Sequence, residues 1–518
     1  MTTGMNILLI TADQFRADSM SAAGHKLVRT PNLDRLAEDG IRFARHYSQC
    51  PPCGPSRTSL LTGMYQMNHR SVQNGTPLDG AFTNIAELAR QAAYVPWLIG
   101  YTDTTLDPRR LHPNDPRAGR YEELLPGIQQ FAPGSEECST DPAWWAQLRE
   151  LGYDCWSDPF RQKPEYAAAA QVKGPTYAPT IVKAEHGLTA FTADQALRFF
   201  RQYAGAPWFL HVSFQRPHPP FVAAEPYHDL YRLEDVPDFV CLPTRAEERA
   251  THPFMPFRLE RLEMNPKLPL DISHPNDSPA WRQARATYYG LITELDHNIG
   301  RMVEALKQLN AYDNTLIVFT SDHGEMLGDH WCWGKETPFD GAVQVPCIVR
   351  SPLVPSSARG RVVEHFSEHV DVMPTVLDHI GIEVPLQCDG RSLRPFLEGD
   401  TPSKWRDAAH WEFDFRNIND ASVDGRFGIS VDECGLAVVR TTKEKYVHFG
   451  GLPPLYYNIA DDPAEMRNLA GDPAHAAAER DMARRMLTWR MVFNRRELTG
   501  IRLQKGTQVH AARARRIV

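Results

Sequence analysis

Two cysteines in the run Cys50-Pro-Pro-Cys53-Gly-Pro-Ser-Arg57 are the residues of this chain best suited to covalent chemistry. A thiolate is a nucleophile, and two cysteines separated by two residues can also form a redox pair or half of a zinc site. A second such pair, or a nearby pair of histidines, is missing from the sequence around them. Arg57 follows Cys53 by one helical turn, and the first amides of such a helix would favour an anion.

Two apolar runs end in residues that can bind a metal ion. Residues 6–12 lead into Asp13 and Gln14, and residues 315–320 lead through Ser321 into Asp322 and His323. Each run is typical of a buried parallel strand, and α/β enzymes place their chemistry at the carboxyl ends of such strands. A metal site is one interpretation. The alternative is that Ser321 and Asp322 only cap a helix.

The stretch from Cys53 to Arg57, continued as Thr-Ser-Leu-Leu-Thr62-Gly63, resembles the signature of the type I sulfatases and the phosphonate monoester hydrolases. The resemblance implies that Cys53 is oxidised after translation to formylglycine by a formylglycine-generating enzyme. In that family the hydrated aldehyde attacks sulfur or phosphorus through one hydroxyl, and the other hydroxyl later expels the product by hemiacetal cleavage. The resemblance also implies that Arg57 holds the formylglycine hydroxyl and the metal-binding carboxylates in position relative to one another.

The same resemblance assigns the metal ligands. Asp13, Gln14, Asp322 and His323 match the family's metal positions, and modified Cys53 would complete the set. Ordinary sulfatases carry paired Asp at the first position and Asp-Asn at the second, where calcium is usual. Because Gln and His replace harder ligands here, we expect one divalent ion, with Mn²⁺ favoured over Ca²⁺ or Mg²⁺. This pattern is more similar to the phosphonate monoester hydrolases.

Four further residues match positions that contact the substrate in the family. Lys335 and His218 correspond to the pair that binds substrate oxygens and assists the leaving group, a role that needs a cation or an acid. A histidine among prolines, such as His218, is otherwise usually a loop residue. Tyr101 stands where sulfatases carry Lys, so the pocket has less positive charge. We therefore expect singly charged esters as substrates.

Asp103 stands where sulfatases carry the His thought to break the hemiacetal, and where phosphonate monoester hydrolases usually carry Thr. The carboxylate could take that proton instead. A second negative charge beside an anion, however, raises its own pKa and disfavours ground-state binding. The alternative, which is about as well supported, is that Asp103 bonds Thr105 or a loop amide.

Alternation of apolar helical and strand patterns predicts an α/β fold, with a large, mostly parallel sheet between helices, as in alkaline phosphatases and sulfatases. We expect a catalytic domain at residues 1–395 and a small C-terminal α+β domain with a tail at 396–518, because short strand patterns begin near residue 410. Residues 106–180 and 228–280 have poor periodicity and are interpreted as insertions, either substrate walls or structural padding. The basic tail 513–516 is expected to be solvated or to embrace another subunit.

Composition excludes several classes of protein. The 518 residues include 42% hydrophobic and 23% charged residues, as in a folded enzyme, and the net charge of −8 argues against a nucleic-acid binder. The nine scattered cysteines fit reduced thiols. A secretory signal and a long apolar stretch are missing from the sequence, so we expect a cytoplasmic protein that does not enter membranes. The tail and insertions favour a homodimer or homotetramer.

These features predict a formylglycine-dependent hydrolase of small anionic esters. The favoured substrates are sulfate monoesters, as in arylsulfatases, with promiscuity toward phosphonate monoesters and phosphodiesters. In one alternative, phosphonate monoester or phosphodiester hydrolysis is the main activity. In another, Cys53 stays a thiol and the chain is an anion-binding pseudoenzyme. A phosphatase or phosphomutase relative using a coded Ser or Thr fits less well, and a redox protein fits least.

Overall fold

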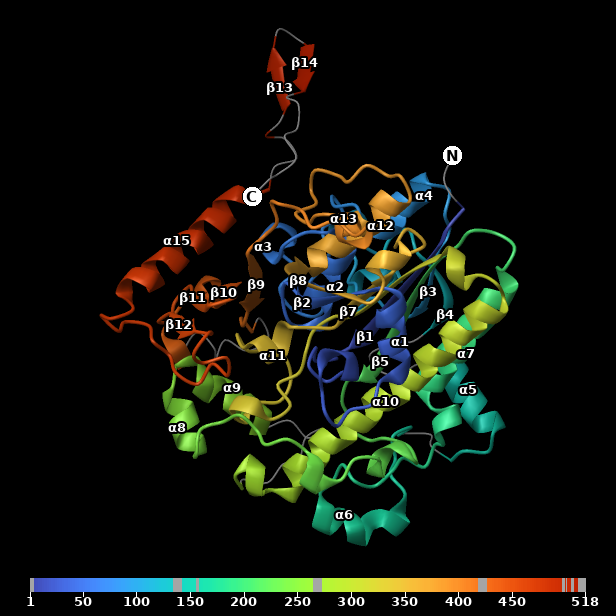
Figure 1. Cartoon of the computed structure of the whole chain (residues 1–518), viewed down its shortest axis with the longest axis horizontal. Helices are drawn as coiled ribbons and strands as arrows, with labels where there is room; N and C mark the ends of the chain where they lie inside the picture. Colours follow the sequence, from blue (N-terminus) through green and yellow to red (C-terminus); the bar gives the residue numbers. More distant parts are fainter. Residues whose placement is uncertain are drawn as a thin grey trace.

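A computed structural model describes residues 4–133, 142–154, 158–263, 273–417, 426–495, 499, 501–504 and 507–510. Its centre is an eight-stranded sheet that lies between two layers of helices (Figure 1). In spatial order the strands are β4 (Gln129–Pro133), β3 (Pro96–Gly100), β5 (Phe209–Pro217), β1 (Asn6–Asp13), β6 (Thr315–Ser321), β7 (Cys347–Arg350), β2 (Ile41–Tyr47) and β8 (Arg361–Glu368). Only β7 runs antiparallel to its neighbours, so the predicted mostly parallel α/β sheet is confirmed.

Strand β1 shows why its sequence is largely apolar. All eight of its residues are buried, and successive side chains point to opposite faces. Leu8 and Ile10 join one hydrophobic core with the helices α1 (Pro31–Asp39), α7 (Leu188–Gln202) and α10 (Pro279–Gln308). Ile7 and Leu9 join a second core with α2 (Cys53–Thr62), α4 (Ile85–Gln91) and α12 (Val372–His379). The sheet is therefore covered on both faces, as parallel sheets require.

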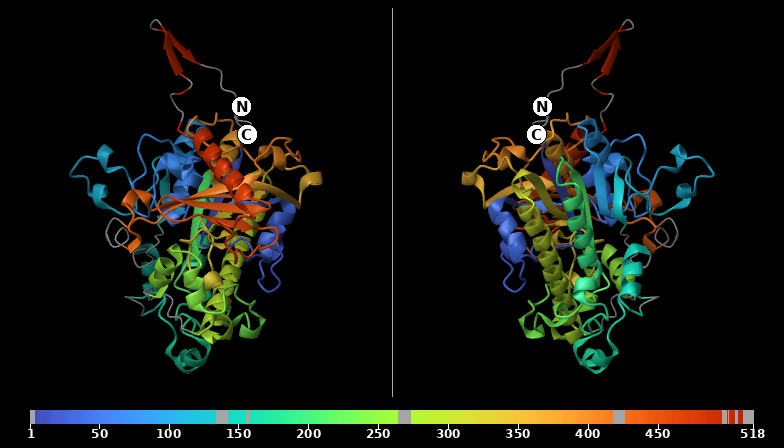
Figure 2. Two further views of the ribbon diagram at one scale, coloured as in Figure 1. Left: turned by 90° about the vertical axis from the view of Figure 1, so that its left-hand side faces the viewer. Right: turned by 90° about the vertical axis from the view of Figure 1, so that its right-hand side faces the viewer.

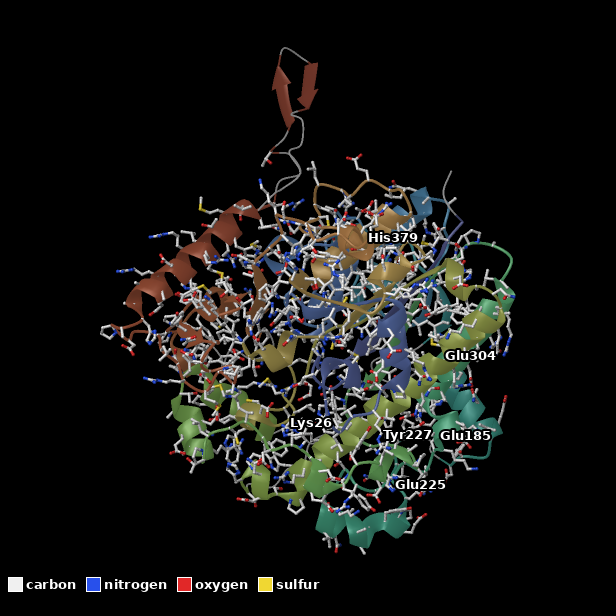
Figure 3. All side chains as sticks on the ribbon, viewed as in Figure 1. Lys26, Glu185, Glu225, Tyr227, Glu304 and His379 are labelled. Carbon is white, nitrogen blue, oxygen red and sulfur yellow. The ribbon has the colours of Figure 1, made fainter. Side chains whose placement is uncertain are left out.

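Helix α10 begins at Pro279 and runs for 30 residues. Ser278 caps it by accepting a hydrogen bond from the backbone of Trp281 (3.3 Å), and Pro279 occupies the first turn. The first turns contain polar residues that are buried, such as Arg285, which donates to the carbonyl of Leu327 (2.9 Å). These residues hide the amphipathic pattern in the sequence. Glu304, on the far part of the helix, is exposed to solvent (Figure 3).

A second, four-stranded antiparallel sheet lies beside the first. Its order is β12 (Leu455–Asn458), β11 (Glu444–Phe449), β10 (Gly435–Thr441) and β9 (Ala408–Asp414), and α15 (Ala476–Val492) packs on it through Met482, Met486 and Trp489. This is the predicted C-terminal domain with short strands. A hairpin of β13 (Ile501–Gln504) and β14 (Thr507–His510) stands away from the body (Figure 2). The basic tail 513–516 lies outside the described residues.

The region predicted as a first insertion contributes to the central sheet. Strand β4, within residues 106–180, pairs with β3 and forms one edge, so this part is scaffold. Helix α5 (Pro142–Glu150) buries Trp144 and Leu148 against Phe191 of α7. The second region, 228–280, carries α8 (Arg245–Ala250) and α9 (Phe254–Glu263). Within the described residues, no helix combines the length and the apolar character that a membrane crossing needs.

Candidate active site

The ends of β1 and β6 bring the two predicted ligand pairs together. The strands are parallel neighbours in which Ala12 pairs with Ser321, so Asp13 and Asp322 leave the same edge of the sheet side by side. Gln14 then adopts a left-handed backbone conformation (φ 71°), and its backbone N–H donates to Asp322 Oδ1 (3.1 Å). A turn of this kind is unusual for a residue with a side chain and points to a constrained site.

Helix α2 places Cys53 at its first position and Arg57 one turn further on, with all ten of its residues buried. Arg57 Nε donates to Asp322 Oδ2 (2.9 Å), and Nη2 donates to Asp13 Oδ2 (3.2 Å). Tyr101 donates its hydroxyl to the same Asp13 oxygen (2.5 Å), and the guanidinium of Arg57 lies over its ring. Arg57 and Tyr101 thus orient the two carboxylates, and the other oxygens, Asp13 Oδ1 and Asp322 Oδ1, lie 3.7 Å and 3.6 Å from His323 Nε2.

Four buried groups offer a metal ligand each. Single ligand atoms of Asp13, Cys53, Asp322 and His323 lie within 4.8 Å of one another. His323 Nδ1 lies 3.0 Å from the carbonyl oxygen of Gly324, so this nitrogen carries the hydrogen and Nε2 keeps its lone pair. Nε2 faces the cluster, 3.2 Å from Cys53 Sγ. Two carboxylates, one imidazole and one sulfur fit a divalent transition metal.

Burial controls protonation in this site. It lowers the pKa of His323 well below its ordinary value, and the charge of Lys335 lowers it further, which keeps the imidazole neutral as a ligand must be. Burial raises the pKa of Tyr101 well above its ordinary value, and the adjacent Asp13 adds to this effect. Tyr101 therefore remains a hydrogen-bond donor to Asp13 at neutral pH.

Lys335 is a cation next to Cys53. Its Nζ lies 3.0 Å from Cys53 Sγ and 3.2 Å from Gln14 Oε1. His218 follows β5, with Nδ1 2.7 Å from the carbonyl oxygen of Pro219. Its charge when protonated lies close enough to lower the pKa of His323. Lys335 therefore lies at this site, and His218 lies within electrostatic range of His323.

Asp103 packs against the start of α2 and is only 3% exposed, with φ 50°. A Cβ added at Gly54 would lie 3.2 Å from the backbone oxygen of Asp103 and 3.5 Å from its Oδ2. Glycine at position 54 therefore lets a carboxylate approach the residue next to the nucleophile. The sequence left open whether Asp103 acts as a base or bonds Thr105 or a loop amide, and the structure places its carboxylate beside Gly54.

Sequence reasoning missed three residues of the site. Asn74 Oδ1 accepts from the amide of Gly54 (2.9 Å), and Ser213 on β5 accepts from Arg57 Nη1 (2.7 Å). Neither has a spacing signal in the sequence. Glu325 lies only two residues beyond His323, is fully buried, and accepts from Gln14 Nε2. Its position in the run Asp322-His323-Gly324-Glu325 was the available signal.

The cysteine pair does not support a redox site. Among the described residues, Cys50 and Cys53 are not joined by a disulfide. Cys50 Sγ lies 3.7 Å from the hydroxyl of Ser59, and its burial raises the pKa of the thiol far above the range of a reactive cysteine.

Comparison with known proteins extends over both sheets. The family model described as Sulfatase matches residues 5–382, and the model described as N-sulphoglucosamine sulphohydrolase, C-terminal, matches residues 328–491. The multifunctional alkaline phosphatase superfamily protein PehA of Trinickia caryophylli is 41% identical, covering 96% of this chain and 98% of PehA. An arylsulfatase of Clostridium perfringens is 28% identical over 90% of each chain.

A solved structure gives the same picture. The phosphonate monoester hydrolase of Agrobacterium radiobacter superposes on this chain with a TM-score of 0.91 at 41% sequence identity. The alignment covers 98% of this chain and 99% of that enzyme. The likeness therefore includes the central sheet, the smaller sheet and the segments between them.

Proposed function

The chain belongs to the sulfatase family and is an ester hydrolase of that family, and we propose that it prefers phosphonate monoesters and phosphodiesters over sulfate monoesters. The observation that carries this preference is the nearly full-length likeness, at 41% identity, to a phosphonate monoester hydrolase. The arylsulfatase likeness is weaker, at 28%. This order reverses the one favoured from the sequence alone.

The charges of the site support a singly charged substrate. Arg57 lies one helical turn from Cys53, but its guanidinium is paired with both Asp13 and Asp322. It is therefore not available to bind a substrate anion. Lys335, at 3.0 Å from the sulfur, is the cation left to meet the oxygens of an ester anion. Tyr101 adds a hydroxyl where sulfatases have a second lysine, so a dianionic phosphate monoester is less well compensated.

We propose that Cys53 is matured to formylglycine, which supplies a nucleophilic hydroxyl, and that one divalent ion held by Asp13, Gln14, Cys53, Asp322 and His323 acidifies it and offsets substrate charge. Mn²⁺ suits the mixed donor set. Lys335 binds the non-bridging oxygens, and His218 donates a proton to the departing alkoxide or aryloxide. Arg57 and Tyr101 hold the carboxylates of Asp322 and Asp13 in place.

Asp103 is proposed to accept the proton that must leave the nucleophile residue when the product is expelled. Its carboxylate, buried beside Gly54, lies against the residue next to Cys53.

We also propose that the active protein is a homodimer or homotetramer. Leu487 (59% exposed) and Met491 (67% exposed) present apolar surface on α15, and the hairpin of β13 and β14 projects beyond it (Figure 1). A second copy of the chain would cover both. Light scattering of the full chain and of a chain ending at residue 495 tests this: loss of assembly in the short chain supports the proposal, and a monomeric full chain contradicts it.

The deciding experiment compares kcat/KM for an aryl phosphonate monoester, an aryl phosphodiester and an aryl sulfate. The protein is produced together with a formylglycine-generating enzyme and loaded with Mn²⁺, and Cys53→Ala is the control. We expect the phosphorus esters to be hydrolysed faster and the control to be inactive. A preference for the sulfate would make the chain an arylsulfatase, and activity that survives Cys53→Ala would rule out the formylglycine mechanism.

A further inference from the structure

Glu325 is a fully buried carboxylate that connects two parts of the site. One oxygen, Oε2, accepts a hydrogen bond from Gln14 Nε2. The other, Oε1, accepts from the backbone amides of Leu327 (3.0 Å) and Gly334 (2.5 Å). Gly334 immediately precedes Lys335, so the same carboxylate contacts the residue after Asp13 and the turn that presents the lysine.

The chemistry of its neighbours fixes the orientation of the Gln14 carboxamide. An ionised carboxylate only accepts hydrogen bonds, and a lysine ammonium only donates them. The carboxamide lies between these two groups, with Glu325 on one side and Lys335 Nζ, 3.2 Å from Oε1, on the other. Its NH₂ group must therefore face Glu325, and its oxygen must face Lys335.

We propose that Glu325 is a positioning residue that turns the carboxamide oxygen of Gln14 toward the metal ion. This inference rests on the metal site of the proposed function and concerns how that site is tuned. Lys335 Nζ contacts both Gln14 Oε1 and Cys53 Sγ, so the oxygen faces the side on which the ligand cluster lies. An amide oxygen is a metal ligand, whereas an amide NH₂ group is not.

The rest of the Gln14 residue is already fixed, which leaves the amide orientation as the variable that Glu325 controls. The backbone carbonyl oxygen of Gln14 accepts from the hydroxyl of Tyr288 (2.7 Å), and the backbone N–H of Gln14 donates to Asp322 (3.1 Å). The backbone is thus bonded on both sides. Partners of this kind, one step beyond the ligands, typically change metal affinity by about 10- to 100-fold when they are altered.

Glu325→Gln is the sharpest test because it preserves shape and changes only donors and acceptors. The two backbone amides at Oε1 require an oxygen there, so the new NH₂ group must take the place of Oε2. It then faces the NH₂ group of Gln14, two donors meet, and the Gln14 amide must flip. We expect the Kd for Mn²⁺ to rise about 10- to 100-fold, measured from free Mn²⁺ by electron paramagnetic resonance.

The exchange Gln14→Glu with Glu325→Gln tests the orientation itself. In this double variant the new NH₂ group at position 325 donates to a carboxylate at position 14, whose other oxygen faces the metal. We expect Mn²⁺ affinity to return to at least the level of the unchanged protein, with a larger share of Ca²⁺ binding because the ligand is harder. If the double variant does not restore Mn²⁺ binding, the proposal is overturned. This test also applies if Glu325→Gln alone does not fold, because it depends on the double variant.

Glu336→Gln is the matched control. Glu336 lies next to Lys335, and its carboxylate pairs with Arg258 (2.9 Å). Glu336→Gln removes one negative charge near the site, as Glu325→Gln does, but leaves the hydrogen bond between Glu325 and Gln14 in place. The Kd of this variant for Mn²⁺ should therefore stay within about twofold of that of the unchanged protein. An equal rise of Kd in Glu336→Gln and Glu325→Gln overturns the proposal, because the effect would then reflect charge alone.

The metal readout separates this inference from the proposed function. If the unchanged protein binds no Mn²⁺, both fail. If Mn²⁺ binding follows the expected pattern across the variants but no ester is hydrolysed, the positioning role of Glu325 stands and the proposed function fails. If Glu325→Gln binds Mn²⁺ as the unchanged protein does, the positioning role is wrong whatever the activity.

Discussion

Two buried clusters of charged residues in this molecule have similar composition but differ in how their charges are compensated. The site cluster consists of Asp13, Cys53, Arg57, Asp322 and His323 at the ends of β1 and β6. The junction cluster consists of Tyr47, Asp340, Arg440, Lys445 and Glu465, where the central sheet meets the smaller one.

The junction cluster is electrically complete. Lys445, which is fully buried, pairs with both Asp340 (3.0 Å) and Glu465, and Arg440 pairs with Asp340 from the other side (3.0 Å). Two cations therefore meet two carboxylates. Asp340 also donates its backbone amide to Glu465 (2.9 Å). Nothing in this arrangement leaves a charge for a ligand to compensate.

The site cluster holds two carboxylates and one cation, and the ammonium of Lys335 lies beside it at Cys53. A single guanidinium, that of Arg57, is shared by two carboxylates, and the imidazole of His323 is kept neutral by burial. A divalent cation would complete it, and His323 Nε2 and the carboxylate oxygens already face inward. The comparison teaches that a functional cluster is recognised by the charge that is missing, whereas a structural cluster closes on itself.

The largest expected effect is on activity at the site cluster. Arg57→Met should lower kcat/KM for an aryl phosphonate by about 10³-fold, because Asp13 and Asp322 lose the group that orients them and misplaced catalytic groups are costly. Steady-state kinetics with Mn²⁺-loaded protein measures this. Stability should change little when the metal is bound, since the cation still compensates both carboxylates. A large loss of stability with intact kcat/KM would make Arg57 a structural residue, as Lys445 is.

The reverse result is expected at the junction cluster. Lys445→Met should lower the free energy of unfolding by about 3–5 kcal/mol, because Asp340 and Glu465 remain buried with one cation between them. Urea unfolding measures the loss. Below the unfolding transition, kcat/KM should equal that of the unchanged protein. A selective fall in kcat/KM at a temperature where the variant is folded would contradict the separation of the two clusters.

A smaller effect is expected for Asp103, which lies at the site but outside the cluster. Asp103→Asn should slow steady-state turnover by about 10²-fold, within the range for loss of a general base. The initial burst of released aryloxide should be unchanged, since only the later step needs the base. Stopped-flow measurement resolves the two phases. Unchanged burst and steady-state rates would leave Asp103 with a structural role.

The site cluster was largely predictable from the sequence, and the junction cluster was not. Asp13 and Asp322 end apolar runs of the kind that form parallel strands, so their proximity follows from the sheet. Asp340, Lys445 and Glu465 come from three separate segments and no periodicity relates them. Their pairing depends on how the two sheets pack. For the same reason β4 falls within a predicted insertion. Its pairing with β3 in the folded sheet identifies it as a strand, and its sequence pattern does not.

The smallest expected effect is a pH dependence of stability at the junction cluster. Burial alone would raise the pKa of Asp340, but Lys445 and then Arg440 overcome it and lower the pKa from 3.8 to about 2. A carboxyl whose pKa is depressed on folding stabilises the protein fully above its unfolded value and loses that contribution as the pH falls toward the folded value. The loss should therefore occur between pH 4 and pH 2 and amount to about 1–2 kcal/mol.

Other carboxyls also titrate in this range, so the contribution of Asp340 is isolated by difference. Urea unfolding of the unchanged protein and of Lys445→Met at pH 6, 4 and 3 gives two stability curves. Because Lys445 is the main cause of the depressed pKa, the curve of Lys445→Met should fall less steeply below about pH 4. Parallel curves would mean that Arg440 alone holds Asp340 ionised, and that Lys445 acts chiefly on Glu465.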